Sequence, residues 1–154
     1  MPASMMWAMS DDHPWRRLRD LTDWTLRWER LPEATAALID WSACTITVDI
    51  NLSQAGRRCA IAHELEHVAR GPSADPREET LVEQAAACRL VGIDELADAV
   101  RWTGDAAEMA EELWVDADML AARLAVLTPA QRRVLDAVAD DVRGGGGKEC
   151  GYRD

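Results

Sequence analysis

The chain has 154 residues, enough for one domain with a substantial core, and its formal net charge of −11 argues against nucleic acid as a general partner. No stretch approaches the ~18 apolar residues of a membrane span, and the N-terminus lacks the pattern of a secretion signal. The four cysteines lack the paired spacing of a zinc ribbon, so we interpret them as reduced thiols. Residues with AT-rich codons are scarce, which favours a GC-rich bacterial or phage genome. We therefore expect a cytoplasmic protein of a bacterial host cell.

The first part of the chain predicts a short helix and then three strands. The helix begins after His13 and ends near Asp20, and the strands cover residues 24–29, 38–41 and 45–52. Apolar and polar residues alternate along the third strand, so one of its faces is buried and the other is polar. This pattern is typical of a small antiparallel sheet.

A long helix is predicted next, from Gln54 to about Arg70. Ser53 is a suitable N-cap, and the pair Gly71-Pro72 ends the helix. Residues Ile61, Leu65 and Val68 recur at the spacing of one helical face. We expect that face to anchor the helix in the core.

The same helix contains His-Glu-x-x-His, formed by His63, Glu64 and His67. Residues four apart lie one turn above each other, so the two imidazoles can bind one metal ion. Glu64 is offset toward the metal side, where a carboxylate can take a proton from water. Two ordinary surface histidines on an amphipathic helix are the alternative. Cys59, one turn before His63, is expected to pack above the site rather than bind the metal.

A catalytic zinc usually has three protein ligands, so a third ligand is expected downstream. The next predicted helix, residues 77–91, carries Glu79 and Glu83 on one face, with Ala86 and Ala87 one turn further on. These small residues let the two helices approach closely, and we prefer Glu83 as the ligand because it lies mid-helix beside them. Glu79 is the alternative, and a solvated acidic face is the simplest explanation for either. Two imidazoles and a carboxylate suit Zn²⁺ or Mn²⁺, and the order of affinities favours Zn²⁺.

The rest of the chain is predicted to be helical, with segments at about residues 95–102, 106–114, 116–127 and 129–143. Residues 144–154 begin with four glycines and are expected to form a disordered tail. We therefore predict an α+β fold with one domain, residues 1–143. Its sheet and metal-binding helices cover about 15–92, and its helical C-terminal part covers about 93–143.

Two further stretches make the sequence similar to the ImmA/IrrE family of metallopeptidases (domain of unknown function 955), especially its small actinobacterial and actinophage members. The matching motifs are Arg57-Arg58-Cys59-x-x-Ala62-His63-Glu64-Leu65-Glu66-His67 with Gly71-Pro72, Arg77-Glu78-Glu79-x-x-Val82-Glu83-x-x-Ala86-Ala87-x-x-Leu90, and Glu112-Leu113-Trp114-Val115-Asp116 with Arg123-Leu124.

This resemblance implies a gluzincin-like site in which the acid of an acid-x-x-Ala pattern, here Glu83, is the third ligand. Better understood members of the family cleave a transcriptional repressor and so release a mobile element or a stress response. Glu66 departs from the family pattern, which usually has a small residue there. We expect it to point away from the metal, although it is large enough to narrow the cleft.

The leading hypothesis is therefore a cytoplasmic zinc endopeptidase, a hydrolase that cleaves a helix-turn-helix repressor and uses Glu64 as its base. The alternative is a protein-binding regulator in which the metal site is structural or vestigial. DNA binding is a third hypothesis, because residues 106–127 resemble a helix-turn-helix unit. Asp116 and Asp118 at the start of its second helix would repel phosphates, which disfavours this hypothesis.

Overall fold

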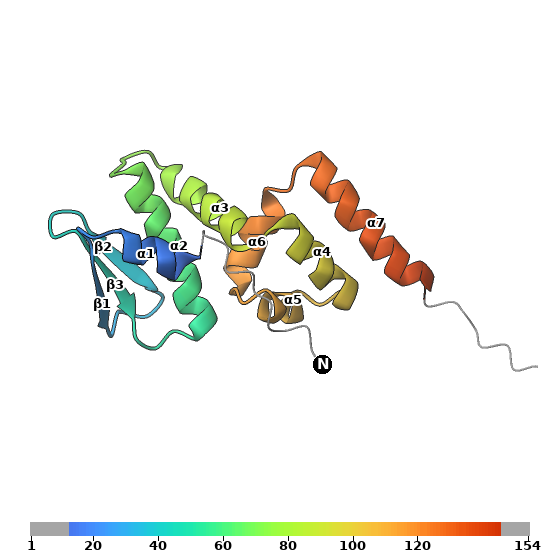
Figure 1. Ribbon diagram of the computed structural model, residues 1–154, viewed down its shortest axis with the longest axis horizontal. Helices are drawn as coiled ribbons and strands as arrows, with labels where there is room; N and C mark the ends of the chain where they lie inside the picture. Colours follow the sequence, from blue (N-terminus) through green and yellow to red (C-terminus); the bar gives the residue numbers. More distant parts are fainter. Residues whose placement is uncertain (1–12, 146–154) are drawn as a thin grey trace, which may run out of the picture.

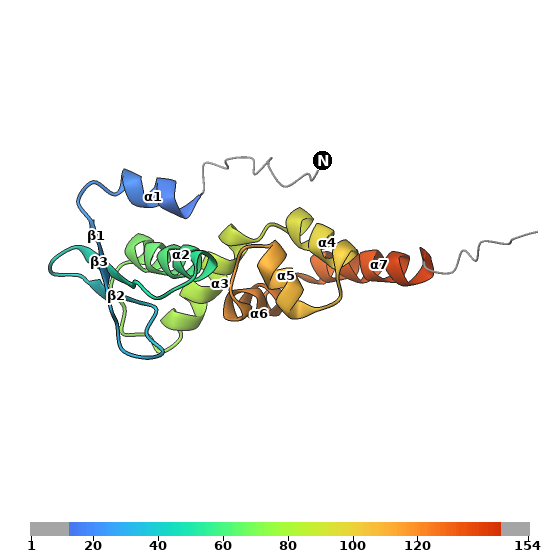
Figure 2. The same ribbon diagram turned by 90° about the horizontal axis from the view of Figure 1, so that it is seen from below.

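The structure, a computed structural model, describes residues 13–145 and has an α+β fold, as predicted (Figure 1). A three-stranded sheet lies at one end and helices lie at the other, with two helices between them (Figures 1 and 2). The described elements are α1 (Pro14–Asp20), β1 (Thr25–Glu29), β2 (Ala37–Asp40), β3 (Thr45–Asp49), α2 (Gln54–Arg70), α3 (Glu78–Leu90), α4 (Ile93–Trp102), α5 (Ala106–Glu112), α6 (Ala117–Ala125) and α7 (Pro129–Gly145). No helix among these residues is both long and apolar enough to cross a membrane.

The sheet is mixed, so the prediction of an antiparallel sheet was wrong for one of its two strand pairs. Its strand order is β1-β3-β2, with β1 parallel to β3 and β2 antiparallel to β3. The alternation of polar and apolar residues is the same in both arrangements, because it reports burial of one face and not strand direction. The strand Thr45–Asp49 is therefore central, and β2 lies at an edge of the sheet.

Helix α2 begins and ends where its local signals place it. The Ser53 hydroxyl accepts a hydrogen bond from the amide of Gly56, and Gly71 follows the last turn with a φ of 84°. A left-handed φ of this kind is easily adopted only by glycine, which has no Cβ to clash with the backbone. The chain can therefore turn sharply and return as α3.

Two hydrophobic clusters lie on different faces of α2. Ile61 and Leu65 are buried with Ile46 and Val48 of β3, and Val68 packs against this cluster at its border. Cys59 and Ala62 belong instead to a cluster formed with α3–α7. Helix α2 thus lies between the two hydrophobic clusters. The apolar face predicted from Ile61, Leu65 and Val68 packs on the sheet.

Among the C-terminal helices, α6 packs on α3 and α7 packs on α4, and Arg58 ties α2 to this part of the fold. The guanidinium of Arg58 donates to the carbonyls of Leu90, Leu113 and Trp114, which lie at the ends of α3 and α5. Helix α7 extends two residues beyond the predicted end at Arg143, to Gly145. The remainder of the predicted disordered tail lies outside the described residues.

Candidate metal centre

His63 and His67 lie one turn apart on the face of α2 between its two hydrophobic clusters. Their ring centroids are 4.9 Å apart, and the ring planes meet at 67°. Both side chains are largely buried, with 16% and 18% of their surface exposed. The backbone of a single helix thus holds two imidazoles close to one point, as the four-residue spacing predicts.

Helix α3 brings Glu79 to both histidines. One carboxylate oxygen of Glu79 is 2.8 Å from Nε2 of His63, and the other is 3.2 Å from Nε2 of His67. One donor atom from each of the three residues lies within 4.8 Å of the other two. Two imidazole nitrogens and a carboxylate oxygen form a donor set typical of zinc, so these residues fit a metal ion.

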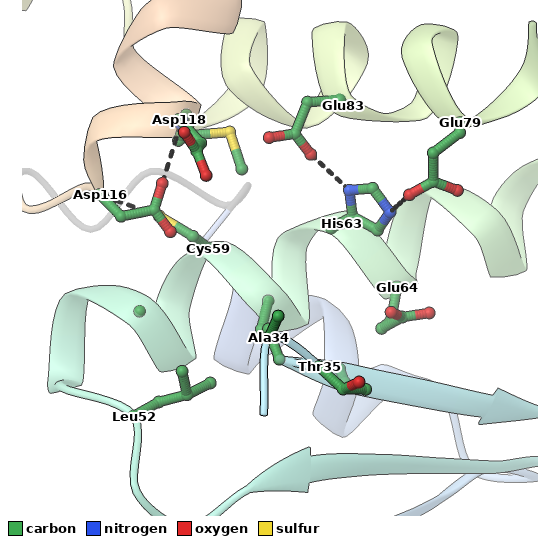
Figure 3. A pocket seen from close by; sticks show the side chains of 15 residues that line it. Ala34, Thr35, Leu52, Cys59, His63, Glu64, Glu79, Glu83, Asp116 and Asp118 are labelled. Carbon is green, nitrogen blue, oxygen red and sulfur yellow. Dashed lines mark hydrogen bonds and ion pairs between the residues drawn. The ribbon is translucent and has the colours of Figure 1, made fainter. Parts of the chain in front are cut away.

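Glu83 also reaches His63, but on the other side of the ring. Its Oε2 is 2.5 Å from Nδ1 of His63 (Figure 3), and it forms no ion pair with His67. Because α3 runs back along α2 from the turn, Glu79 is nearer the turn and contacts both histidines, while Glu83 contacts only the first. The geometry therefore favours Glu79, the alternative of the sequence analysis, over Glu83 as third ligand.

Glu83 has a different place in this arrangement. When Nδ1–H of His63 donates to a carboxylate, the ring is held in one orientation, and Nε2 is left to bind a metal. Burial lowers the pKa of His63, but the hydrogen bond to Glu83 and the charges of Glu64, Glu79 and Glu83 outweigh burial, and the net pKa is raised. Metal binding at His63 therefore competes with protonation more strongly than it would at an ordinary imidazole.

The carboxyl of Glu64 is buried and has no hydrogen bond or ion pair to any of the described residues. Only 7% of Glu64 is exposed, yet it lines the cleft beside the histidines. Burial raises the pKa of Glu64 to about 7; the charge of His63 lowers this pKa and the charge of Glu79 raises it. A carboxyl of this kind is suited to exchange a proton near neutral pH.

Glu66 points away from the metal centre and does not line the cleft. It is 4% exposed and forms ion pairs with Arg17 of α1, at 3.0 Å, and with Arg89 of α3, at 2.7 Å. The large residue at this position therefore occupies a structural site between three helices. It leaves the cleft open.

The cleft beside the histidines has a volume of about 340 Å³. Its lining comes from residues 34–37 at the start of β2, from α2, from Glu79 and Glu83 of α3, and from residues 116, 118 and 119 at the start of α6 (Figure 3). Cys59 also lines it, and its Sγ accepts a hydrogen bond from the amide of Asp116 at 3.4 Å. The thiol is thus engaged with α6 and stands apart from the converging donor atoms of the two histidines and Glu79.

Asp116, Asp118 and residues 34–37 line the cleft although the sequence does not indicate that they lie there. Asp116 is recognisable as an N-cap, and its carboxylate accepts from the amide of Met119. No local pattern indicates that α6 reaches back to α2, because the contact joins residues more than fifty positions apart in the chain.

Comparison with known proteins gave no match for this chain among family models, curated proteins or solved structures.

Proposed function

We propose that the protein is a metal-dependent endopeptidase with His63, His67 and Glu79 as the metal ligands and Glu64 as the general base. The observation that carries this proposal is the buried Glu64 carboxyl without a partner among the described residues, next to a converging His–His–Glu donor set in an open cleft. A solvated acidic surface would not bury such a carboxyl, because burial of an unpaired acid costs free energy. Its position is explained by a ligand that enters the cleft.

The chemistry divides between the metal and the chain. A bound Zn²⁺ would acidify water and polarise a carbonyl group. Glu64 takes the proton from the attacking water and then delivers it to the amine that leaves, which is necessary because amide nitrogen is a poor leaving group. Glu83 keeps the ring of His63 in the orientation that presents Nε2.

The open edge of β2 supports a polypeptide substrate. The amide of Asp49 donates to the carbonyl of Ala36, so Ala36 faces β3, and alternation along the strand directs the backbone groups of Ala37 away from β3. A peptide in the cleft can pair with these groups as an additional strand. The central strand β3 cannot take this role, because β1 and β2 pair with both of its edges.

The proposed partner is a transcriptional repressor of the helix-turn-helix class, in the cytoplasm of a bacterial host. This part rests on the resemblance to the ImmA/IrrE family. Residues of the matching motifs also make contacts that hold this fold together. Arg58 joins α2 to the ends of α3 and α5, and Asp116 caps α6 beside Cys59.

Glu64→Gln tests the proposal directly. Glutamine keeps the size of the side chain but cannot accept the water proton, so cleavage of a repressor encoded next to this protein should fall about 10²–10⁴-fold while zinc content is unchanged. His63→Ala should lose zinc as well as activity. Glu112→Gln is the matched control, because it makes the same change at an exposed helical glutamate that does not line the cleft.

The outcomes separate the two leading hypotheses. Full activity of Glu64→Gln would refute the assignment of the base, and loss of zinc from Glu64→Gln would show that this residue is a ligand. If the wild type and all variants bind the repressor equally and none cleaves it, the non-catalytic regulator is the better description.

A further inference from the structure

Hollow surface continues on both sides of the histidine and glutamate cluster. The cleft next to β2 ends at Glu79 and Glu83, and a second hollow of about 430 Å³ begins at the same two residues. This second hollow lies between α3 and α6, and its remaining lining residues are Thr80, Gln84, Ala121, Ala122 and Ala125. The three alanines keep the groove shallow and open. A binding site with hollows on both sides can hold an internal segment of a bound polypeptide. A site closed on one side would instead select the end of a polypeptide.

The cleft on the β2 side is acidic. Five carboxylates line it, from Glu64, Glu79, Glu83, Asp116 and Asp118, and no lysine or arginine is among its described lining residues. In Figure 3, Asp118, Glu83 and Glu79 follow one another along the wall formed by α6 and α3, opposite Ala34 and Thr35. Four of these carboxylates already have an assigned role: Glu64, Glu79 and Glu83 in the proposed site, and Asp116 as the N-cap of α6. Asp118 is exposed in the first turn of α6 and forms no hydrogen bond or ion pair within residues 13–145.

A second observation indicates that a ligand enters this cleft. Glu64 is only 7% exposed, so it is more than nine-tenths buried, and it lines the cleft without a hydrogen bond or ion pair to the part of the chain that the structure describes. A group that enters the cleft from solvent can therefore contact this carboxyl. Because the charged side chains at the α6 end of the cleft, Asp116 and Asp118, are both acidic, an entering chain that presents a positive side chain there is favoured, and one that presents a negative side chain is repelled.

We propose that the substrate is an extended polypeptide segment that crosses the site from the β2 cleft to the alanine groove and places a lysine or arginine against Asp118. Cleavage of that segment rests on the proposed function, but its recognition does not. Exposed charge pairs of this kind contribute enough for roughly a two- to fivefold preference, and this preference weakens as salt screens the charges.

Recognition is tested by binding to zinc-loaded Glu64→Gln, so that no probe is consumed. The probe is a fluorescein-labelled, unstructured peptide of about twelve residues, nearly 40 Å when extended, with one central arginine among alanine and serine. The comparison peptides carry citrulline, which has the same shape without the charge, or glutamate. We expect the arginine peptide to bind roughly two- to fivefold more tightly than the citrulline peptide, and the glutamate peptide to bind weakest.

Added in the Glu64→Gln background, Asp118→Asn should remove the preference for arginine over citrulline. Asp94→Asn is the matched control, because Asp94 is an exposed aspartate in the first turn of α4 and lines neither hollow. The control should keep the full preference. Equal binding of arginine and citrulline peptides, no measurable binding, or an equal loss in both variants would overturn the role of Asp118.

The crossing path is tested with Ala121→Leu, which fills the groove, and with Ala107→Leu on the exposed side of α5 as control. Ala121→Leu should weaken binding of the long peptide at least threefold and leave binding of a peptide truncated on the groove side unchanged. Unchanged or tighter binding of the long peptide would refute the crossing path.

Failure of the proposed function would look different from failure of this recognition. If the wild type never cleaves the arginine peptide but the Asp118-dependent preference is present, the peptidase proposal fails and the recognition proposal stands. If the wild type cleaves arginine and citrulline peptides equally well, the recognition proposal fails and the peptidase proposal stands.

Discussion

Replacing Glu79 by alanine is expected to weaken zinc binding more than the same replacement of Glu83. Glu79 lies 2.8 and 3.2 Å from the Nε2 atoms of the two histidines, whereas Glu83 contacts only Nδ1 of His63. The first change therefore removes a donor from the metal group, and the second removes the hydrogen-bond acceptor that orients one donor.

The magnitudes follow from this difference. Binding of Zn²⁺ by four ligands releases about 10–16 kcal/mol, so one ligand accounts for about 2.5–4 kcal/mol, or roughly 10²–10³-fold in affinity. Loss of an orienting partner behind a histidine typically costs about 10–100-fold. Glu83→Gln should cost less than Glu83→Ala, because the amide oxygen of glutamine still accepts from Nδ1–H.

Zinc affinity is measured by competition with a fluorescent chelator at pH 7.5, for wild type, Glu79→Ala, Glu83→Ala and Glu83→Gln. Glu112→Ala serves as control, since Glu112 is an exposed helical glutamate that forms no ion pair within the described part of the chain and lines neither hollow. Circular dichroism of the metal-free proteins shows whether each variant is folded. Abolished binding in a Glu83→Ala variant that is folded like the wild type, together with near-normal binding by Glu79→Ala, would refute the assignment and restore Glu83 as the ligand.

Two further predictions concern buried groups away from the ligands. Glu66→Ala leaves Arg17 and the half-exposed Arg89 without this carboxylate and should lower the free energy of unfolding by about 2–3 kcal/mol, below the usual range for a fully buried pair. That corresponds to a melting temperature lower by about 5–10 °C in calorimetry, and a loss below about 1 °C would contradict it. Burial raises the pKa of Cys59 to about 12, so its thiolate fraction at pH 8 is about 10³-fold below that of an ordinary thiol. Iodoacetamide should therefore label exposed Cys88 and spare Cys59 in peptide mass spectrometry, and equal labelling would show that Cys59 is accessible.

The features predictable from sequence are those encoded by neighbouring residues. The bounds of α2 were predicted from Ser53 and Gly71, because a cap and a left-handed glycine act within one turn of the helix. The burial of Ile61 and Leu65 followed from the helical period in the same way. The proximity of His63 and His67 needs only the geometry of one helix.

The features that could not be predicted depend on contacts between distant elements. The alternation of polar and apolar residues in β3 indicates which face of the strand is buried. It does not indicate that β1 pairs with β3 in parallel, because that direction depends on the path of the chain between the two strands. Glu79 and Glu83 lie on one face of α3. Which of them reaches both histidines depends on the position of α3 along the axis of α2. Glu83 was preferred from the sequence because small residues lie next to it. Those residues, Ala86 and Ala87, form the seam where α3 packs against α2, and they do not determine which glutamate reaches both histidines.

The packing of α2 against α3 at that seam also sets the geometry of the proposed metal site. Ala86 and Ala87 are fully buried and lie in one cluster with Cys59 and Ala62 of α2. Because protein cores are close-packed, any larger side chain there must push α3 away from α2. Glu79 bridges two histidines of the other helix at 2.8 and 3.2 Å, so a shift of about 1 Å in that seam is enough to disrupt the donor set. The small size of Ala86 and Ala87 therefore positions Glu79, the proposed third ligand, because it sets the distance between α3 and α2.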